Sequence, residues 1–352
     1  MGGIVGLGGG TGASRLWRAL AGPAGAGQLT LVVNTADSLW QHGLRICPDL
    51  DTVLYALSGR LDPGRGWGIR DDSFRCMAAL AGAGGESWFR LGDLDLATHL
   101  YRTGLLRDGT TLTEVTRRLA GSHHIPARLL PMTDDDVTTT IVTADGRRLH
   151  YEEYLVREQG APAVRGVAFE GIGQAVPAPG VLAAIEAAGL IVLGPSDPVA
   201  GLLPILGLPG VTEALRKRRD RVTAVSPIAA DAAVSGPGQS RRGQSRAALL
   251  AAVNLPATAA GVARLYRDVC SRFVYDPGDR DEAPRIAAHG VEPVPADLLR
   301  QEDTPPGPLI SALLRPARVS GGAAPGTGIR GTGSAGDAPG TVRCGPSSSG
   351  GS

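Results

Sequence analysis

The sequence predicts an α/β protein with a Rossmann-like, doubly wound parallel sheet and a smaller inserted α+β lobe. The opening GGIVGLGGGTGASRLWRAL (2–20) is typical of a buried strand, a glycine-rich turn and a helix. The same order returns later, with helices expected over 181–188 and 211–218 and strands over 190–193 and 222–225. Because alternating strands and helices form parallel sheets with right-handed crossovers, we expect helices on both faces.

The first half adds one more core strand and then changes character. LTLVVNTAD (29–37) is a β-branched run typical of a central parallel strand. Residues 71–118 look mainly helical, and TTTIVTADGRRLHYEEYLV (138–156) alternates apolar and polar residues as an antiparallel hairpin does. We therefore expect one domain over 1–316, with its core at about 1–65 and 160–316 and the inserted lobe at about 66–159. The Gly/Ala/Ser/Pro-rich residues 317–352 should form a disordered tail.

Composition excludes several classes of protein. The chain has 352 residues, 35 basic against 34 acidic side chains and 4% aromatic residues, which argues against nucleic-acid and membrane-surface partners. Four cysteines without a CxxC pair indicate reduced thiols, and the N-terminus lacks the pattern of a signal peptide. Residues 188–211 carry one charge, Asp197, but four prolines there predict a buried strand and loop instead of a membrane span. We expect a soluble cytoplasmic protein.

The first candidate site is the glycine-rich turn, in which Gly10, Thr11 and Gly12 follow the first strand. Glycines at a strand-to-helix junction let an anion approach backbone amides and the helix N-terminus. The run is not a P-loop, and Thr11 occupies the last glycine position of GxGxxG. Its alternative role is a tight turn that packs the helix on the sheet.

Acidic residues form the second candidate site. Asp37 follows the second strand at the sheet edge where such folds bind ligands, and Asp49 and Asp51 follow on a loop if their helix begins near Asp51. Three converging carboxylates beside a phosphate-binding turn would suit Mg²⁺. The alternatives are a helix N-cap for Asp51 and a solvated loop acid for Asp37.

Two further acidic blocks have simple structural interpretations. Asp93 and Asp95 can favour the first turn of a helix through its dipole, with His99 as a surface partner of Asp95. Residues 134–136 (DDD) fit a turn before the hairpin.

Two serine–proline loops, GPSDPVAGLLPIL and AVSPIAADAAVSGPG, each follow a buried strand. Ligand-facing loops are expected at such strand ends, so Ser196 and Ser226 are candidate binding residues, although a structural turn explains each one separately. The absence of GxSxG, HExxH and basic–aromatic patterns leaves serine hydrolase, zinc peptidase and RNA-binding functions poorly supported.

Taken together, several blocks resemble the 2-phospho-L-lactate transferase family, whose bacterial members are described as phosphoenolpyruvate transferases. They are GGTG, NTAD, HGLRICPDLDTVLY, RGWG, LGDLDLATHLYRT, LLPMTDDDV, PSDP and AVSPI, in family order from about residue 3 to 315. HGLR-C-PDLDT combined with LGD-DLATH is highly specific, whereas GGTG alone is weak.

The resemblance implies a reaction in coenzyme F-420 biosynthesis. The hydroxyl of a deazaflavin alcohol attacks a guanosine diphosphate-linked donor, GMP leaves, and Mg²⁺ is required. The resemblance also implies a homodimer. By motif match, Asp51 and Arg90 contact the deazaflavin, Asp37, Asp49 and Asp51 lie at the metal, and Asp37 or Asp51 takes the hydroxyl proton. The donor is held by Gly10, Thr11, Gly12, Ser196, Pro198 and Ser226.

The sequence also departs from the family pattern. Ser38 stands where a second acid is usual, and Asp197 stands in place of the usual asparagine of Ser-Asn-Pro. These changes point to weaker Mg²⁺ binding or to a paralogue with another acceptor. The HGLR-C-PDLDT block favours an enolpyruvyl over a lactyl donor, by analogy.

Two other functions stay open at this stage. A regulator that binds nucleotide sugars, of the gluconeogenesis-factor type, shares the GGGTG opening but typically has an acidic–glycine–serine stretch where NTADSLWQHG stands here. A nicotinamide dehydrogenase fits the strand–glycine–helix order with Asp37 on the next strand, but the interrupted GxGxxG argues against it.

Overall fold

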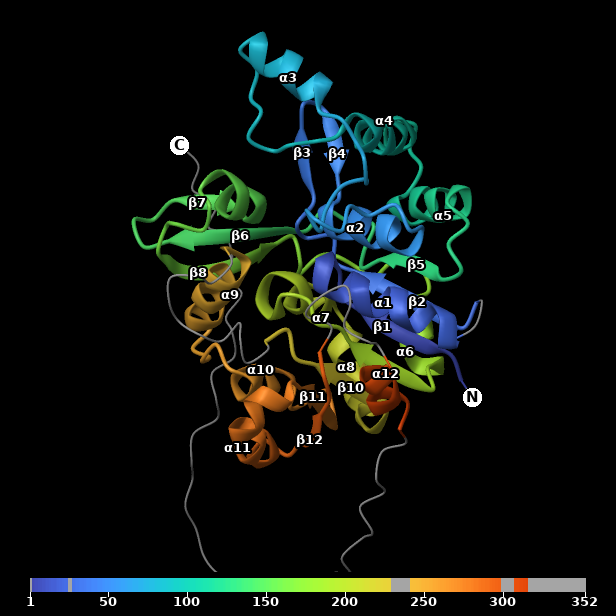
Figure 1. The fold of residues 1–352 in the computed structure, drawn as a ribbon, viewed down its shortest axis with the longest axis vertical. Helices are drawn as coiled ribbons and strands as arrows, with labels where there is room; N and C mark the ends of the chain where they lie inside the picture. Colours follow the sequence, from blue (N-terminus) through green and yellow to red (C-terminus); the bar gives the residue numbers. More distant parts are fainter. Residues whose placement is uncertain (1, 25–26, 229–240, 299–306, 316–352) are drawn as a thin grey trace, which may run out of the picture.

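A seven-stranded parallel sheet forms the centre of the computed structural model, which describes residues 2–24, 27–228, 241–298 and 307–315 (Figure 1). Its order is β12-β11-β10-β9-β1-β2-β5, and every neighbouring pair is parallel. The strands are β1 (Ile4–Leu7), β2 (Leu29–Val33), β5 (Arg128–Pro131), β9 (Leu190–Leu193), β10 (Val222–Val225), β11 (Arg272–Tyr275) and β12 (Glu292–Pro295). This arrangement confirms the predicted fold class.

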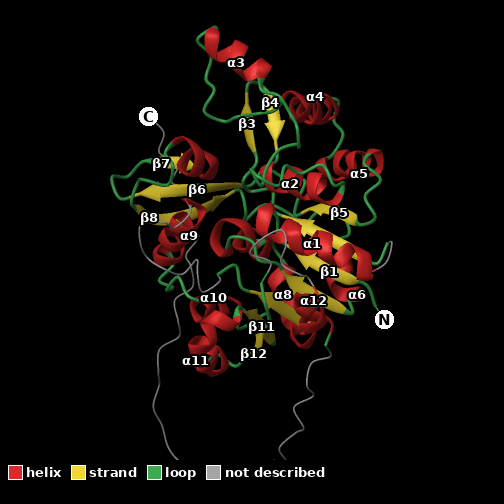
Figure 2. Cartoon of the chain, in the orientation of Figure 1, coloured by secondary structure: helices red, strands yellow, loops and turns green. Residues whose placement is uncertain are grey.

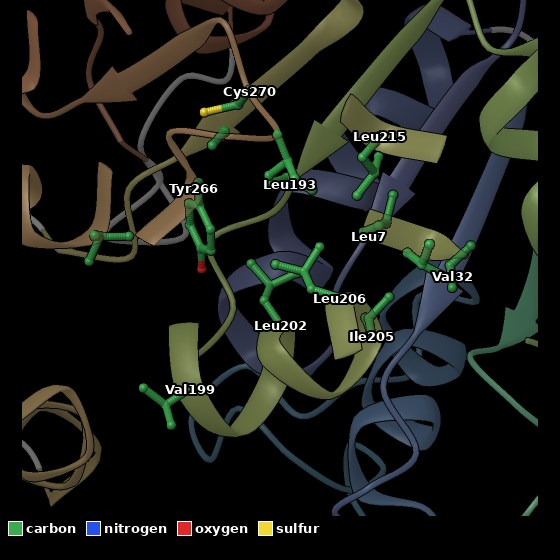
Figure 3. Close-up of a cluster of buried hydrophobic side chains, with 14 of the residues drawn as sticks. Leu7, Val32, Leu193, Val199, Leu202, Ile205, Leu206, Leu215, Tyr266 and Cys270 are labelled. Atoms are coloured by element: carbon green, nitrogen blue, oxygen red, sulfur yellow. The ribbon is translucent and has the colours of Figure 1, made fainter. Parts of the chain in front are cut away.

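Helices cover both faces of the sheet, as the alternation of its side chains requires. Along β2, Leu31 and Val33 join one buried cluster while Val32 joins the other, because successive strand residues point to opposite faces. One face packs against α1 (Gly10–Ala24), α2 (Pro48–Leu57), α5 (Leu112–Ser122) and α12 (Gly307–Leu314). The other packs against α6 (Val181–Ala187), α7 (Leu203–Gly207), α8 (Val211–Lys217), α9 (Arg241–Ala252), α10 (Ala259–Tyr266) and α11 (Ala283–Ala288). Figure 3 shows Leu7, Val32 and Leu193 from three strands meeting Ile205 and Leu206 of α7.

The order in which the chain adds strands to the sheet reverses between β1 and β9. From β1 the chain proceeds through β2 to the β5 edge, and it then returns to β9 on the other side of β1 before continuing to β12. In open parallel sheets, the crevice at such a reversal, beyond the carboxyl ends of the strands, is the usual ligand site. The loops after β1 and β9 therefore face one crevice.

The predicted boundaries of the inserted lobe were wrong in two places. Strand β5 falls within 66–159 but pairs with β2 in the main sheet, because its Leu129 and Leu130 are buried in the two cores. Strand β8 (Val164–Glu170) falls in the predicted core but pairs with β6 (Thr138–Thr143) in a separate sheet. Two excursions therefore leave the core instead of one.

Figure 2 shows these two excursions on different sides of the molecule. The first contains the hairpin β3 (Leu39–Gln41) and β4 (Leu44–Ile46), with α3 (Arg75–Gly82) and α4 (Asp93–Arg107). The second is the sheet β7-β6-β8, in which β7 (Arg148–His150) forms the predicted hairpin with β6. Between β7 and β8 lies a π-helical turn, η1 (Glu153–Arg157).

The apolar stretch 188–211 is helical where a loop was predicted. After β9 come a π-helical turn, η2 (Pro198–Leu202), and α7, and proline occupies the first or second position of both. Proline is tolerated there because that N–H has no partner in a helix anyway, so the prolines start these turns instead of breaking them. Short 3₁₀ turns, η3 (Arg219–Arg221) and η5 (Pro277–Glu282), complete the described elements.

No single helix in the described ranges is long and apolar enough to span a membrane; one bent pair, Pro198–Gly207 with Val211–Lys217, passes on length and composition only. The predicted tail at 317–352 lies outside the described residues.

Candidate active site

A cleft of about 1180 Å³ opens at the carboxyl ends of β1, β2, β9 and β10. Most of the residues predicted from the sequence line it, namely Gly10, Thr11, Gly12, Asp49, Asp51, Arg90, Ser196 and Ser226. Two do not: Asp37 is 2% exposed beneath the cleft, and Pro198 is buried as the first residue of η2. The fold therefore gathers most of the predicted site from four separate strand ends.

The glycine turn after β1 brings backbone close to two neighbouring loops. Gly8 and Gly10 have φ of 122° and 73°, conformations that favour glycine. A Cβ on Gly9 would lie 2.6 Å from Cβ of Asp49, and one on Gly12 would lie 2.5 Å from the carbonyl oxygen of Pro195. These glycines are required for close packing, and they also leave the N-terminus of α1 open to the cleft.

Helix α2 begins at Pro48, with Cys47 as its N-cap, and not near Asp51 as predicted. Asp49 and Asp51 therefore belong to the first helical turn instead of a loop. Residues two apart on a helix are separated by about 200°, so the two carboxylates point in different directions. They form two different walls of the cleft.

The first wall, called the acidic wall, consists of Asp49 and Glu152 beside the glycine turn, together with Asp37, which is buried behind Asp49. Oδ2 of Asp37 accepts the backbone N–H of Asp49 (2.9 Å), and Oδ2 of Asp49 accepts from Nδ2 of Asn34 (3.0 Å). Burial, with repulsion from Asp49 and Glu152, raises the pKa of Asp37 well above its ordinary value. Burial likewise raises the pKa of Asp49 to about 6 and that of Glu152 to about 8.

Glu152 was not predicted from the sequence. It lies between β7 and η1, more than a hundred residues from the acids it faces, and its only local signal is the apolar–polar alternation of the hairpin. Burial and charge repulsion make the acidic wall a place where negative charge is unfavourable without a cation.

The residues of the acidic wall fit a magnesium ion only in part. Oδ1 of Asp37 is buried and has no hydrogen-bond partner among the described residues, as expected of a carboxylate that lacks its cation. Within the described ranges, however, no three His, Cys, Asp or Glu side chains converge as a metal cage. Mg²⁺ is usually held by one or two carboxylates together with water and substrate phosphates. Asp37 and Asp49 can supply those two carboxylates. Asp51, the third predicted ligand, points elsewhere.

The second wall, called the arginine-clamped wall, is centred on Asp51. Nη1 of Arg102 donates to Oδ2 of Asp51 (3.0 Å), and Nη2 of Arg102 donates to Oδ1. The backbone N–H of Cys47 also donates to Oδ2 (3.3 Å). The predicted N-cap role for Asp51 is therefore wrong: its carboxylate forms a bidentate ion pair with a buried arginine of α4.

His99 continues this network instead of forming the predicted surface pair with Asp95. The imidazole is 1% exposed, its Nδ1 lies 3.2 Å from Nη1 of Arg102, and its Nε2 lies 3.2 Å from Oδ1 of Asp95. The hydroxyl of Tyr55 donates to the same oxygen at 2.6 Å. Burial raises the pKa of the Asp95 carboxyl, but His99, Tyr55 and Arg102 outweigh it and hold that pKa below its ordinary value.

The spacing of these residues was a signal that sequence reasoning missed. Asp95, His99 and Arg102 recur at i, i+4 and i+7, so they share one face of α4, and that face is buried. The opposite face carries the exposed Leu100 and Tyr101. A helix with charged residues inward and apolar residues outward indicates a buried polar network.

The serine hydroxyls of the two serine–proline loops donate hydrogen bonds to backbone carbonyls of the protein. The Ser196 hydroxyl donates to the carbonyl of Gly9 (2.8 Å), and the Ser226 hydroxyl donates to the carbonyl of Ile228 (2.9 Å). Asp197 caps η2 by accepting the N–H groups of Val199 and Ala200. The carboxylate of Asp197 therefore stabilises the start of η2. Because both serine hydroxyls already donate, their oxygens can only accept hydrogen bonds from a ligand.

Aromatic and basic side chains complete the cleft. Of the 14 aromatic residues in the chain, five line it: Tyr55, Trp67, Trp88, Phe89 and Tyr151. Six arginines also line it: Arg15, Arg65, Arg90, Arg241, Arg242 and Arg246. The guanidinium of Arg90 stacks on the ring of Phe74 at 4.4 Å, and Nη1 of Arg242 donates to Oγ1 of Thr11 (2.6 Å). A planar apolar ring and an anion could both be accommodated.

The 134–136 segment has the structural role that was judged simplest. Asp134 accepts the N–H of Thr113, Asp135 accepts the N–H of Val176, and Asp136 pairs with Arg45 at 3.0 Å. None of these three acids lines the cleft.

Comparison with solved structures agrees with the fold. The chain is similar to protein BH3568 from Bacillus halodurans in two crystal structures, one of which describes it as a member of the UPF0052 family. The TM-scores are 0.58 and 0.59, at 18% and 17% identity, covering 86% and 90% of this chain and 94% and 99% of those chains. At this identity the likeness concerns the fold alone.

Sequence comparison is more specific. The chain is 40% identical over 291 residues to the 2-phospho-L-lactate transferase of Methanosarcina mazei, which covers 83% of this chain and 92% of that protein. It is also 40% identical over 293 residues to the phosphoenolpyruvate transferase of Streptomyces coelicolor, covering 82% and 89%. The family model described as 2-phospho-L-lactate transferase CofD matches residues 4–299, which include both walls of the cleft. The chain belongs to this CofD family of 2-phospho-L-lactate transferases.

Proposed function

We propose that this protein transfers a phosphoenolpyruvyl or 2-phospho-L-lactyl group from a guanosine diphosphate-linked donor to a deazaflavin alcohol, in coenzyme F-420 biosynthesis. The acceptor is 7,8-didemethyl-8-hydroxy-5-deazariboflavin, and GMP is the leaving group. Family membership supports the reaction class, and relatives bearing each of the two transferase names share 40% identity with this chain.

The observation that carries the proposal is the division of one cleft into two chemically different walls. The acidic wall adjoins the glycine turn and Arg242, where an anion can meet backbone amides, a guanidinium and a bound cation. The arginine-clamped wall shares the cleft with Trp88 and Phe89, whose rings offer a surface on which a planar ring can be buried. A reaction between an anionic donor and a neutral aromatic alcohol needs both surfaces side by side.

The bond changes follow directly. An oxygen of the acceptor's hydroxyl forms a bond to the donor phosphorus that carries the carboxylate-bearing group. The bond from that phosphorus to the bridging oxygen breaks, GMP departs with the electron pair, and the hydroxyl proton passes to solvent. Positioning and charge neutralisation should supply most of the rate, as in other phosphoryl transfers. Of the two predicted proton acceptors, Asp37 lies beneath the cleft, whereas Asp51 lines it and already accepts hydrogen bonds from Arg102 on both carboxylate oxygens.

We also propose that Mg²⁺ binds at Asp37 and Asp49 together with the donor diphosphate. Two features support this position: Oδ1 of Asp37 has no hydrogen-bond partner among the residues that the structure describes, and the pKa of Asp49 is raised. When bound, the ion would neutralise diphosphate charge. Asp51 is left out of the metal set because Arg102 already occupies it.

Calorimetry and turnover would test the assignment together. Wild-type protein should bind the deazaflavin alcohol, and it should release GMP when the donor and Mg²⁺ are added. Asp49→Asn should retain acceptor binding but lose turnover by about 100-fold or more, whereas Asp51→Asn should raise the Kd for the acceptor by about tenfold or more. A folded wild-type protein that binds neither the acceptor nor GDP would refute the proposal. Supplying enolpyruvyl and lactyl donors separately decides which group is transferred. The homodimer and the cytoplasmic location stay predictions, and light scattering would test the first.

A further inference from the structure

We propose that Arg102 is the positioning residue of the acceptor site, acting through Asp51. The inference rests on the proposed function, and it adds which atom of Asp51 meets the acceptor and what holds that atom in place. Arg102 itself does not line the cleft, whereas Asp51 and His99 do.

The hydrogen bonds of the Asp51 carboxylate show which of its oxygens can meet the acceptor. A carboxylate oxygen can accept about two hydrogen bonds. Oδ2 of Asp51 already accepts two, from Nη1 of Arg102 and from the N–H of Cys47, while Oδ1 accepts one, from Nη2 of Arg102. Among the described residues no other group donates to this carboxylate, so one acceptor position is left, on Oδ1. The ligand group that meets Asp51 must therefore be a hydrogen-bond donor, such as a hydroxyl or a ring N–H.

The arginine is itself held from several sides, so its direction is fixed. Its Nη1 lies 3.4 Å from the carbonyl oxygen of Arg45 and 3.2 Å from Nδ1 of His99. In the tautomer whose Nδ1 accepts from Arg102, the imidazole hydrogen is on Nε2, which lies 3.2 Å from Oδ1 of Asp95. Tyr55 and Asp95 complete a chain that joins α4 to α2.

Charge explains what the clamp does for binding. The ion pair with Arg102 offsets the charge of Asp51, so a neutral ring can lie beside it with less desolvation of an isolated carboxylate. Without Arg102 the carboxylate would be free to rotate or to attract another cation, and the position on Oδ1 would no longer face the ligand. Lysine cannot replace the arginine, because an ammonium cannot make the two parallel hydrogen bonds.

The test compares acceptor binding with GDP binding in Arg102→Lys, Asp51→Asn and the neutral pair Asp51→Asn/Arg102→Gln. Arg102→Lys should raise the Kd and the KM for the deazaflavin alcohol by about tenfold or more while leaving the Kd for GDP within about twofold. Because Arg102 acts through Asp51, the double variant should bind the acceptor no more weakly than Asp51→Asn alone. Arg107→Gln on the same helix is the matched control, since the exposed Arg107 donates to the carbonyl of Gly43 and, within the described part of the chain, to no other group.

Each outcome is decisive. If wild-type protein fails to bind the deazaflavin alcohol, the proposed function itself is wrong. If wild-type protein binds it and folded Arg102→Lys binds it equally well, only the positioning role is wrong. If Arg102→Lys does not fold, the double variant decides: acceptor binding much weaker than in Asp51→Asn would show that Arg102 acts other than through Asp51.

Discussion

The two walls of the cleft use acids from one helical turn in opposite ways. Asp49 and Asp51 are two residues apart, yet Asp49 faces Asp37, Glu152 and the glycine turn, while Asp51 faces Arg102. On the acidic wall, burial and repulsion between carboxylates raise the pKa values of Asp37, Asp49 and Glu152. On the arginine-clamped wall, the guanidinium of Arg102 pairs with the carboxylate of Asp51.

A sequence motif therefore does not assign a role by residue type alone. In PDLD the two aspartates have the same chemistry, and only the partner surface separates a carboxylate that can receive a cation from one that already has a cationic partner. The acidic wall should gain stability when charge is removed from it, and the arginine-clamped wall should lose stability. The following variants test that contrast.

Breaking the clamp should give the largest change in stability. Arg102→Met leaves the buried Asp51 without its partner and should lower the free energy of unfolding by about 3–5 kcal/mol. Replacing both partners, as Asp51→Leu/Arg102→Met, should recover most of that loss because no charge remains buried. Urea unfolding measures both, with the exposed Arg107→Met as control. A loss below about 1 kcal/mol for Arg102→Met would mean that the pair is solvated.

On the acidic wall, loss of negative charge should stabilise the protein, so its stability should depend on pH. The folded-state pKa of Glu152, about 8, lies above its ordinary 4.5, so the folded protein binds a proton more tightly than the unfolded chain. Without Mg²⁺ and ligand, stability should therefore fall as pH rises from about 4.5 to 8, by about 2–4 kcal/mol from this residue.

Glu152→Gln should flatten that dependence, whereas the exposed Glu86→Gln should not. Thermal unfolding in the presence of a chelator, at pH 5, 7 and 9, measures the slope. An unchanged slope in Glu152→Gln would place this carboxyl in solvent and remove it from the acidic wall.

The glycine turn offers a steric test of the same wall. Gly12→Ala would place a Cβ 2.5 Å from the carbonyl oxygen of Pro195, which should cost about 1–3 kcal/mol and weaken GDP binding. Acceptor binding at the other wall should change little. Gly22→Ala in the same helix meets nothing within 4 Å and should be neutral or slightly stabilising. Equal behaviour of the two variants would contradict the close packing at Gly12.

Asp197→Asn should have the smallest effect. Asparagine can still cap η2, so the free energy of unfolding should change by less than about 1 kcal/mol. Removing the charge near Asp49 should strengthen GDP binding up to about threefold. Titration of GDP in both proteins measures this. Weaker GDP binding in Asp197→Asn would show instead that the aspartate takes part in binding the donor.

Much of the fold could be predicted from local patterns. The β-branched runs, the glycine turn and the strand–helix alternation each depend on neighbouring residues, and all of them appear in the structure. The lobe boundaries could not be predicted, because β5 and β8 are short strands whose sheet is chosen by long-range pairing. The prediction of a loop within 188–211 was wrong because it rested on the number of prolines. Proline is unfavourable inside a helix but acceptable at its first positions.

For the site, the sequence determined which loops meet: strand ends of a parallel sheet lie at one edge, so the glycine turn, PDLD and both serine loops had to share a crevice. Tertiary structure alone decided which partner each acid has. Arg102 is 51 residues from Asp51, and Glu152 is farther still from Asp49. Their contacts depend on how α4 and the end of the β6–β7 hairpin pack beside α2, and burial there sets the charge that each carboxylate can carry.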